Sequence, residues 1–296
     1  MIWVLVVSAV YLALILGLLV FSTRPMRTPA ITSPGAFGAP QEDVAIRVNE
    51  KIELSAWWID APESEAVVVL AHGYFLSKGE LASVSYMLWQ RGISSLLFDF
   101  RAHGKSKGGT CSFGVHEKDD VKAAVRYAKS RMPGKKVILI GSSMGSVAGA
   151  LAWSEEPDLL DGLVLDSAYG RLSKAVLGWW KFMGGPWLSV LLSPTVILGG
   201  PFLGANPFRI DVSEALEKLK GRPILLMHGA KDVLASPKEA ERNLFALGPG
   251  AKAVWFEGCD HSEGRWEQPE KYRVSVFEFL NELGIFSEFS RTKQAK

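Results

Sequence analysis

Residues 137–153 read VILIGSSMGSVAGALAW, and this stretch decides how the chain folds. Residues 137–140 are apolar and have the length of a buried strand, whereas residues 144–153 have the composition of a helix. Between them, GSSMG at 141–145 has the form G-x-S-x-G, in which the two glycines permit a turn too tight for larger side chains. The stretch therefore predicts a strand, a sharp turn and a helix, with a serine lifted above the edge of a sheet.

The alternation of short apolar strands and longer helical stretches continues on both sides of this turn. Strands are expected at 67–70, 94–98, 137–140, 162–165, 223–227 and 253–256, after a hairpin of 44–48 with 52–58. Helices are expected at 81–89, 120–130, 144–153, 237–247 and 269–283. This pattern predicts an α/β protein with a mostly parallel central sheet and helices on both of its faces.

One segment, 175–208, interrupts the alternation. Lys181 is its only charged residue, and two Gly-Gly-Pro triplets break it too often for a membrane-spanning helix. We therefore expect a short cap of helices inserted at about 170–210, over the ends of the strands. Its tryptophans are expected either to pack inward and line a pocket or to rest at a lipid surface: Trp179, Trp180 and Trp187.

The amino-terminal segment 2–21, IWVLVVSAVYLALILGLLVF, contains no charge and no proline. About 20 apolar residues suffice to cross a bilayer core of about 30 Å. A cleaved signal peptide is the competing interpretation, but a basic leading region and a small-x-small cleavage site are missing and the apolar run is too long. We expect a single transmembrane anchor at 1–22. Arg24 and Arg27 follow it directly, so the positive-inside rule places the remaining chain on the cytoplasmic side.

The chain thus divides into four parts. A linker rich in Pro, Gly and Ala is expected at 23–43, the α/β domain with its cap at 44–286, and a tail at 287–296. The net charge is +2 and no basic cluster is present, which argues against nucleic acid as a partner. The two cysteines and five histidines have no metal-ligand spacing, so neither a metal nor a cofactor is expected.

Ser143 is the candidate nucleophile, because it alone has a glycine two residues away on each side, whereas Ser142 is the adjacent competitor. A serine hydroxyl needs a base to take its proton and an acid to orient that base. His261 follows the last predicted strand and is the expected base. Three other histidines precede a glycine and are expected to bond turn backbones: His72, His103 and His228.

Asp232 is the expected acid, because it stands just past a strand and gives the chain order serine, acid, histidine. Asp166, at the end of another strand, is the alternative, and Asp260 is expected to point elsewhere. An acyl-transfer reaction also needs amide donors for the oxyanion. We expect these from the N–H groups of Met144, at the start of its helix, and Tyr74, in the loop after the strand 67–70.

With these motifs the chain resembles the α/β-hydrolase superfamily over about 44–283. Its DFRAHGKS at 99–106 is similar to the D-x-R-x-H-G-x-S stretch of the branch that holds serine aminopeptidase-like and monoacylglycerol-lipase-like enzymes. The resemblance implies the α/β-hydrolase fold and a serine triad, with a bracing role beneath the site for Asp99, Arg101 and His103. Because this cap is short, expectations about substrate that rest on the lids of relatives do not carry over.

The expected activity is that of a serine hydrolase that cleaves a small-molecule or lipid ester through an acyl-enzyme. The apolar cap suits an acyl chain, and nothing obvious would bind a peptide terminus. A thioesterase or a serine peptidase would use the same triad. A catalytically silent binding module tethered to a membrane is the alternative from another class.

Overall fold

Eight strands form one sheet in the order β1-β2-β4-β3-β5-β6-β7-β8 within residues 1–286, which are the residues that the computed structural model describes. The proposed tail at 287–296 lies outside the described residues. The strands are β1 (Glu42–Arg47), β2 (Glu53–Ile59), β3 (Ala66–Ala71), β4 (Ser94–Phe98), β5 (Lys136–Ser142), β6 (Gly162–Asp166), β7 (Ile224–Gly229) and β8 (Lys252–Phe256). Strand β2 is antiparallel to both of its neighbours, and β4, β3 and β5–β8 pair in parallel.

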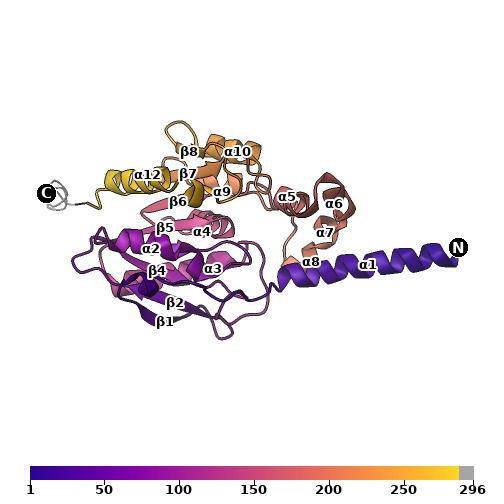
Figure 1. The fold of residues 1–296 in the computed structure, drawn as a ribbon, viewed down its shortest axis with the longest axis horizontal. Helices are drawn as coiled ribbons and strands as arrows, with labels where there is room; N and C mark the ends of the chain where they lie inside the picture. The colour runs from indigo at the N-terminus through magenta and orange to yellow at the C-terminus, as the bar shows by residue number, and fades with distance from the viewer. Residues whose placement is uncertain (287–296) are drawn as a thin grey trace.

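Helices cover both faces of the sheet, as Figure 1 shows. One face carries α3 (Glu117–Arg131), α4 (Met144–Glu155), α9 (Val212–Lys218) and α10 (Pro237–Leu247). The other face carries α2 (Ala82–Trp89) and α12 (Pro269–Glu282). The predicted mostly parallel sheet with helices on both faces is confirmed.

Strand β3 shows why both faces must be covered. Val67 and Val69 belong to the core beneath α3 and α4, whereas Val68 and Leu70 belong to the core beneath α2 and α12. Successive side chains of a strand point to opposite faces, so an uninterrupted apolar run buries half of its residues on each side. All six residues of β3 are buried.

The cap lies between β6 and β7 and consists of α5 (Leu172–Gly184), α6 (Pro186–Leu191), α7 (Pro194–Leu198) and α8 (Gly200–Leu203). Its two ends meet at a narrow neck. The Val212 amide donates to the Gly170 carbonyl at 2.8 Å, and the Leu172 amide donates to the Ile210 carbonyl at 3.1 Å. The cap is therefore an insertion between β6 and β7 whose first and last residues lie side by side.

Helix α1 (Ile2–Thr23) is long and apolar enough to cross a membrane and extends away from the domain (Figure 1). Within residues 1–286, residues 2–10 of α1 are exposed, and its contacts with the cap and the domain run from Tyr11 to Thr23. There Ile15 and Leu19 are buried against Trp180 and Leu192 of the cap. The candidate membrane span is therefore packed against the cap before the chain enters the domain.

The segment between α1 and β1 is held to the domain surface by hydrogen bonds and contains the short helix η1 (Pro34–Phe37). The Arg27 guanidinium donates to several backbone carbonyls of the loop 103–108, including that of Gly108 at 2.8 Å. The Thr28 hydroxyl donates to the Phe75 carbonyl at 2.6 Å. The path of the chain from α1 to the sheet is thus fixed by specific contacts.

We expect the three tryptophans of the cap either to pack inward or to rest at a lipid surface, and the structure places them differently from one another. Trp180 is buried against α1, and its ring N–H donates to the Thr195 hydroxyl at 2.9 Å. Trp179 is half-buried and packs edge-on against Tyr74 with ring centroids 6.0 Å apart. Trp187 is 66% exposed. Two tryptophans therefore face inward and one faces outward.

Phe98 offers a test of this core, because it is fully buried on β4 and packs edge-on against Phe100 at 4.8 Å. We expect Phe98→Ala to lower the free energy of unfolding by about 3–5 kcal/mol, since it leaves a cavity that the sheet cannot close. Phe245→Ala is the matched control, because that ring is 87% exposed, and it should change stability by about 0.5 kcal/mol or less. Urea denaturation of the detergent-solubilised protein measures both, and equal midpoints would contradict the prediction.

Candidate active site

The turn between β5 and α4 places Ser143 at the carboxyl edge of the sheet. Ser143 has φ 48°, a left-handed conformation that a serine adopts only under constraint. A Cβ on Gly145 would lie 2.1 Å from the Ala71 carbonyl oxygen, and a Cβ on Gly141 would lie 2.3 Å from the Ser146 amide nitrogen. Both glycines are therefore required by close backbone contacts, as the G-x-S-x-G pattern predicts.

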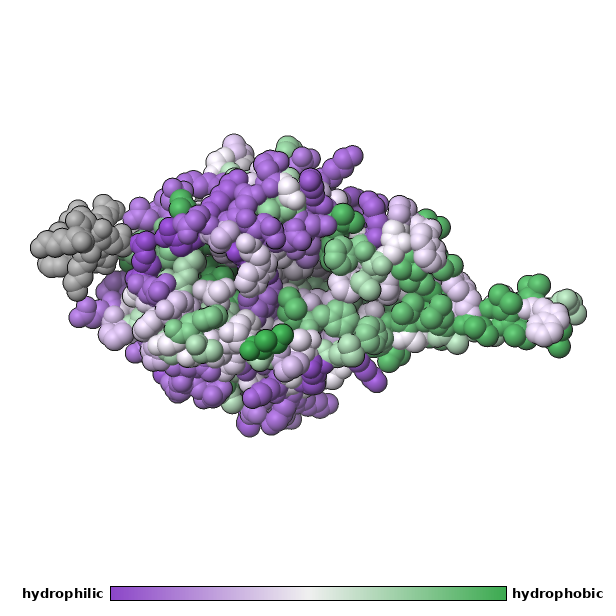
Figure 2. Space-filling view, in the orientation of Figure 1, coloured by the Kyte–Doolittle hydropathy of each residue, from purple (hydrophilic) through white to green (hydrophobic). Residues whose placement is uncertain are grey.

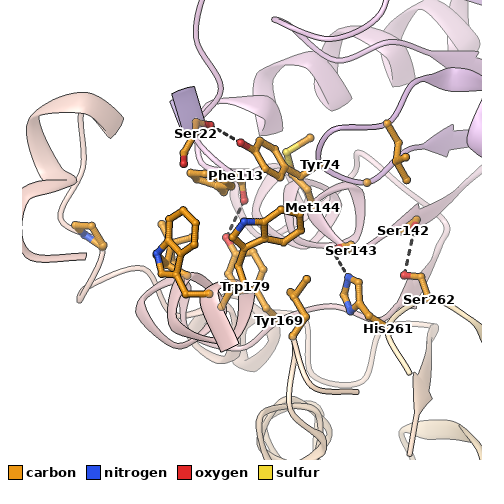
Figure 3. Close-up of a pocket in the computed structure, with 18 of the residues that line it drawn as sticks. Ser22, Tyr74, Phe113, Ser142, Ser143, Met144, Tyr169, Trp179, His261 and Ser262 are labelled. Carbon is orange, nitrogen blue, oxygen red and sulfur yellow. Dashed lines mark hydrogen bonds between the residues drawn. The ribbon is translucent and has the colours of Figure 1, made fainter. Parts of the chain in front are cut away.

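The structure brings Ser143, His261 and Asp232 together in one hydrogen-bonded chain. His261 Nε2 lies 2.8 Å from Ser143 Oγ, and His261 Nδ1 lies 2.8 Å from Asp232 Oδ2 (Figure 3 shows the serine–histidine contact). The Asp232 carboxylate is buried and accepts a second hydrogen bond from the Ala235 amide at 2.7 Å. This geometry allows the imidazole to take the serine proton while the carboxylate holds the other ring N–H.

The competing residues face other partners. Ser142 is buried, and its hydroxyl donates to Glu80 Oε1 at 2.8 Å. Asp166 contacts the Arg265 guanidinium at 3.3 Å and the Ser167 hydroxyl at 3.1 Å. Asp260 Oδ1 accepts the Val233 and His261 amides, both at 2.8 Å, and so joins the loops that carry the acid and the base.

Three other histidines bond backbone groups, as expected from the sequence. Burial lowers the pKa of His103 to about 3, so this ring is neutral, and its Nε2 accepts the Phe75 amide at 3.3 Å. Burial also lowers the pKa of His72, whose Nε2 accepts the Phe100 amide at 3.0 Å. His228 Nε2 lies 2.7 Å from the Ala235 carbonyl. These rings hold the turns around the site.

The stretch 99–106 braces the site from below. Asp99 accepts the Lys78 and Lys105 amides at 2.8 and 2.9 Å and pairs with the Lys78 ammonium at 3.1 Å. Arg101 forms a forked ion pair with Asp120, with its shortest contact at 2.7 Å. Together with His103, these residues hold the loops that follow β3 and β4 by hydrogen bonds.

The amides of Tyr74 and Met144 are the expected oxyanion donors, and both residues line the same cavity as Ser143. Within residues 1–286 neither amide donates a hydrogen bond to another group. Met144 begins α4, so its N–H also lies at the positive end of the helix dipole. Two free amide donors therefore flank the serine.

A buried ion pair between Glu80 and Arg265, which no sequence motif marks, supports this arrangement. Glu80 Oε2 accepts the Gly73 amide at 2.6 Å, and its Oε1 binds both the Ser142 hydroxyl and the Arg265 guanidinium. Burial acts to raise the pKa of Glu80, but the Arg265 charge and these hydrogen bonds outweigh it and hold the pKa below its usual value. Glu80 is therefore an ionised carboxylate that ties the loop of Gly73 to the turn of Ser143.

The cavity in front of Ser143 has a volume of about 360 Å³ and is lined mainly by apolar side chains. It extends from Ser143 and His261 past Tyr74 and Trp179 to the carboxyl end of α1 (Figure 3). This volume falls in the range of small-molecule pockets. Within residues 1–286 no group of three His, Cys, Asp or Glu side chains is placed to hold a metal ion.

Comparisons with known proteins agree with this architecture. The family model of the serine aminopeptidases, family S33, matches residues 62–200. An esterase of Pyrococcus furiosus is 28% identical and superposes with a TM-score of 0.75 over 88% of this chain and 98% of its own.

Two relatives are described as a membrane protein and as a lipase homologue. A protein of Saccharomyces cerevisiae that is described as an uncharacterised membrane protein is 23% identical over 86% of this chain and 84% of its own. A monoglyceride lipase homologue of monkeypox virus is 30% identical over 38% of this chain and 41% of its own. The sheet order, the turn at Ser143 and these similarities together show that the chain belongs to the α/β-hydrolase superfamily.

Proposed function

We propose that this protein is a serine esterase that cleaves a carboxylic ester through an acyl-enzyme, with Ser143 as nucleophile, His261 as base and Asp232 as orienting acid. The observation that carries the proposal is the unbroken hydrogen-bonded chain from Ser143 through His261 to Asp232, with both contacts at 2.8 Å. Two of the comparisons, to an esterase and to a monoglyceride lipase homologue, support the ester as substrate.

In the first half-reaction, Ser143 Oγ attacks the ester carbonyl carbon while its proton passes to His261 Nε2. The negative charge that develops on the carbonyl oxygen is bound by the amides of Tyr74 and Met144. When the tetrahedral intermediate collapses, the C–O bond to the alcohol breaks and His261 returns the proton to the departing oxygen. Asp232 stabilises the imidazolium that exists between these two transfers.

In the second half-reaction, water takes the place of the alcohol. His261 accepts a proton from the water as its oxygen attacks the acyl carbon, and the same amides bind the oxyanion again. Collapse releases the carboxylic acid, and the proton returns to Ser143 Oγ. The enzyme is thereby restored, and one ester and one water have become one acid and one alcohol.

The lining of the cavity favours an ester over a peptide with a free amino terminus. Of the two carboxylates in the lining, Glu80 is buried and paired with Arg265, and Glu263 is exposed and accepts the Asp260 amide at 2.7 Å. The lining therefore has no buried, unpaired carboxylate that would bind an ammonium group. The rest of the wall suits the apolar part of an ester. A thioester would fit the same wall, and a silent binding module would have no use for a complete triad.

We further propose that α1 anchors the protein in a membrane with the domain on the cytoplasmic side. The length of α1, its lack of charge and the yeast relative described as a membrane protein support anchoring. The outer face of the cap adds to the apolar surface beside α1 (Figure 2), where Phe182, Met183, Trp187 and Val190 are each more than half exposed. Arg24 and Arg27 support the orientation.

Ser143→Ala should abolish labelling by a fluorophosphonate probe and lower ester turnover by about 10⁴-fold or more, because the nucleophile is removed. Ser142→Ala is the matched control and should retain labelling, since that hydroxyl is bound to Glu80. Gel fluorescence and p-nitrophenyl ester hydrolysis measure the two effects. Labelling that survives in Ser143→Ala but is lost in Ser142→Ala would move the nucleophile by one residue.

Asp232→Asn should lower kcat by about 10⁴-fold, because the amide favours the wrong tautomer of His261. Asp166→Asn should be much less damaging to kcat, since Asp166 contacts Arg265 rather than the base. Steady-state kinetics on both variants decide the assignment. A larger loss in Asp166→Asn would show that the acid is misassigned.

Glu80→Gln should lower kcat by about 10-fold to 100-fold with a smaller change in KM, because the Gly73 peptide and the neighbouring oxyanion donor lose their fixed position. Glu267→Gln is the control, since that side chain is exposed on the nearby α11 (Gly264–Glu267). Kinetics and thermal melting are measured in parallel. A lowered melting temperature with unchanged kcat would assign Glu80 a purely structural role.

A further inference from the structure

One stripe of the apolar helix α1 faces the protein rather than its surroundings. Tyr11, Ile15, Leu19 and Ser22 recur every three or four residues and so lie on one side of the helix. The Tyr11 hydroxyl donates to the Leu191 carbonyl of the cap, and Ile15 and Leu19 are buried. Leu14 lies about 140° around the helix from Leu19, and it is 50% exposed. The stripe gives α1 a specific partner within its own chain.

The last turn of α1 forms part of the cavity wall. Leu19, Ser22 and Thr23 line the same cavity as Ser143 and His261, which lie at its other end. Tyr74 and Trp179 stand between the two ends (Figure 3). The cavity is therefore enclosed on one side by the domain and the cap and on the other by the proposed anchor.

The same turn holds the loop that carries the proposed oxyanion donor. The Tyr74 hydroxyl donates to the Ser22 carbonyl at 2.6 Å, which is the dashed contact beside α1 in Figure 3. The Thr23 carbonyl accepts the Cys111 amide at 2.7 Å, and Phe21 packs against Phe75 with ring centroids 5.7 Å apart. These contacts satisfy carbonyls at the end of α1 that would otherwise lack partners.

The two ends of the cavity differ in polarity. Its charged lining residues belong to the catalytic end, where Glu80 and Arg265 contact Ser142, and Glu263 follows His261. The end beside α1 is lined by apolar side chains and by hydroxyl and glycine residues without charge. The Thr23 hydroxyl is already bonded to the Leu19 carbonyl at 2.8 Å. This end can therefore accept a hydrocarbon chain without leaving a buried charge unpaired.

We propose that the last turn of α1 is part of the substrate-binding site and limits the length of the acyl chain that the site accepts. This inference rests on the proposed function, because it assigns the acyl chain of an ester to the end of the cavity beside Leu19. When the carbonyl carbon lies at Ser143, the chain extends past Tyr74 and Trp179 toward α1. The helix that anchors the protein then also selects its substrate.

The test uses the full-length protein in detergent and a series of alkyl fluorophosphonates of increasing chain length. Leu19→Trp adds bulk to the far wall, so the ratio of long-chain to short-chain labelling rates should fall at least about tenfold. Leu14→Trp adds the same bulk to the exposed side of α1 and should leave the ratio unchanged. The same ratio measured with p-nitrophenyl esters should follow the labelling.

Leu19→Ala is the second variant and removes bulk from the same wall, so the ratio should rise and the preferred chain should lengthen. Labelling by the shortest reagent reports that each variant is folded. Length profiles that are the same in Leu19→Trp, Leu19→Ala and Leu14→Trp would overturn the inference. Labelling of Ser143 without ester turnover would overturn only the assignment of an ester as the substrate. If the unsubstituted protein is not labelled at all, both the assignment of Ser143 as nucleophile and this inference are overturned.

Discussion

The contact between the start of α4 and the end of β3 is the constraint on which the site depends. Gly145 lies so close to the Ala71 carbonyl that no side chain fits between them. Because of this approach, the turn at Ser143 lies directly beside the loop of Gly73 and Tyr74. The serine hydroxyl and the two candidate oxyanion donors are therefore brought together by backbone packing, before any side-chain contact is made.

A cluster of three buried charged side chains lies beside this contact. Arg265 lies between Glu80 and Asp166, and both carboxylates are buried with it. Burial raises the pKa of Asp166 despite the nearby guanidinium, whereas Glu80 is held ionised by its additional hydrogen bonds. The hydrogen bonds distinguish Asp166 from Asp232: Asp166 is engaged by Arg265 and Ser167, whereas Asp232 lies 2.8 Å from His261 Nδ1.

The parts of the fold that could be predicted are those that depend on short, local sequence patterns. Strands such as 137–140 are apolar runs, the turn at Ser143 is marked by its two glycines, and parallel strands necessarily bring their carboxyl ends to one edge. Asp232 and His261 could be proposed because each follows a strand. Their distance from Ser143 could not be predicted, since it depends on how the loops after β7 and β8 are held.

Glu80 and Arg265 could not be found in this way, because they are 185 residues apart in the chain and neither belongs to a motif. A charged residue has the same appearance in a sequence whether it becomes buried in a pair or stays in water. The hydrogen bonds of Arg27 could not be predicted for the same reason. Its position after an apolar run indicates topology, but in the structure its guanidinium also binds the carbonyls of the loop 103–108.

For the apolar segment at the amino terminus, too, the sequence does not show which residues contact the rest of the protein, and here the contacts concern the cavity in front of Ser143. Leu and Ile satisfy a lipid environment and a protein cavity equally well, so hydropathy cannot distinguish the side of α1 that faces a bilayer from the side that faces the cap. Contacts do distinguish them. Without α1, Trp180 and Leu192 would lose the surface that buries them, the cavity would be open on one side, and the Tyr74 hydroxyl would lose its acceptor. The helix is therefore better described as part of the wall of the cavity in front of Ser143 that is also suited to cross a membrane than as a tether joined to an independent domain.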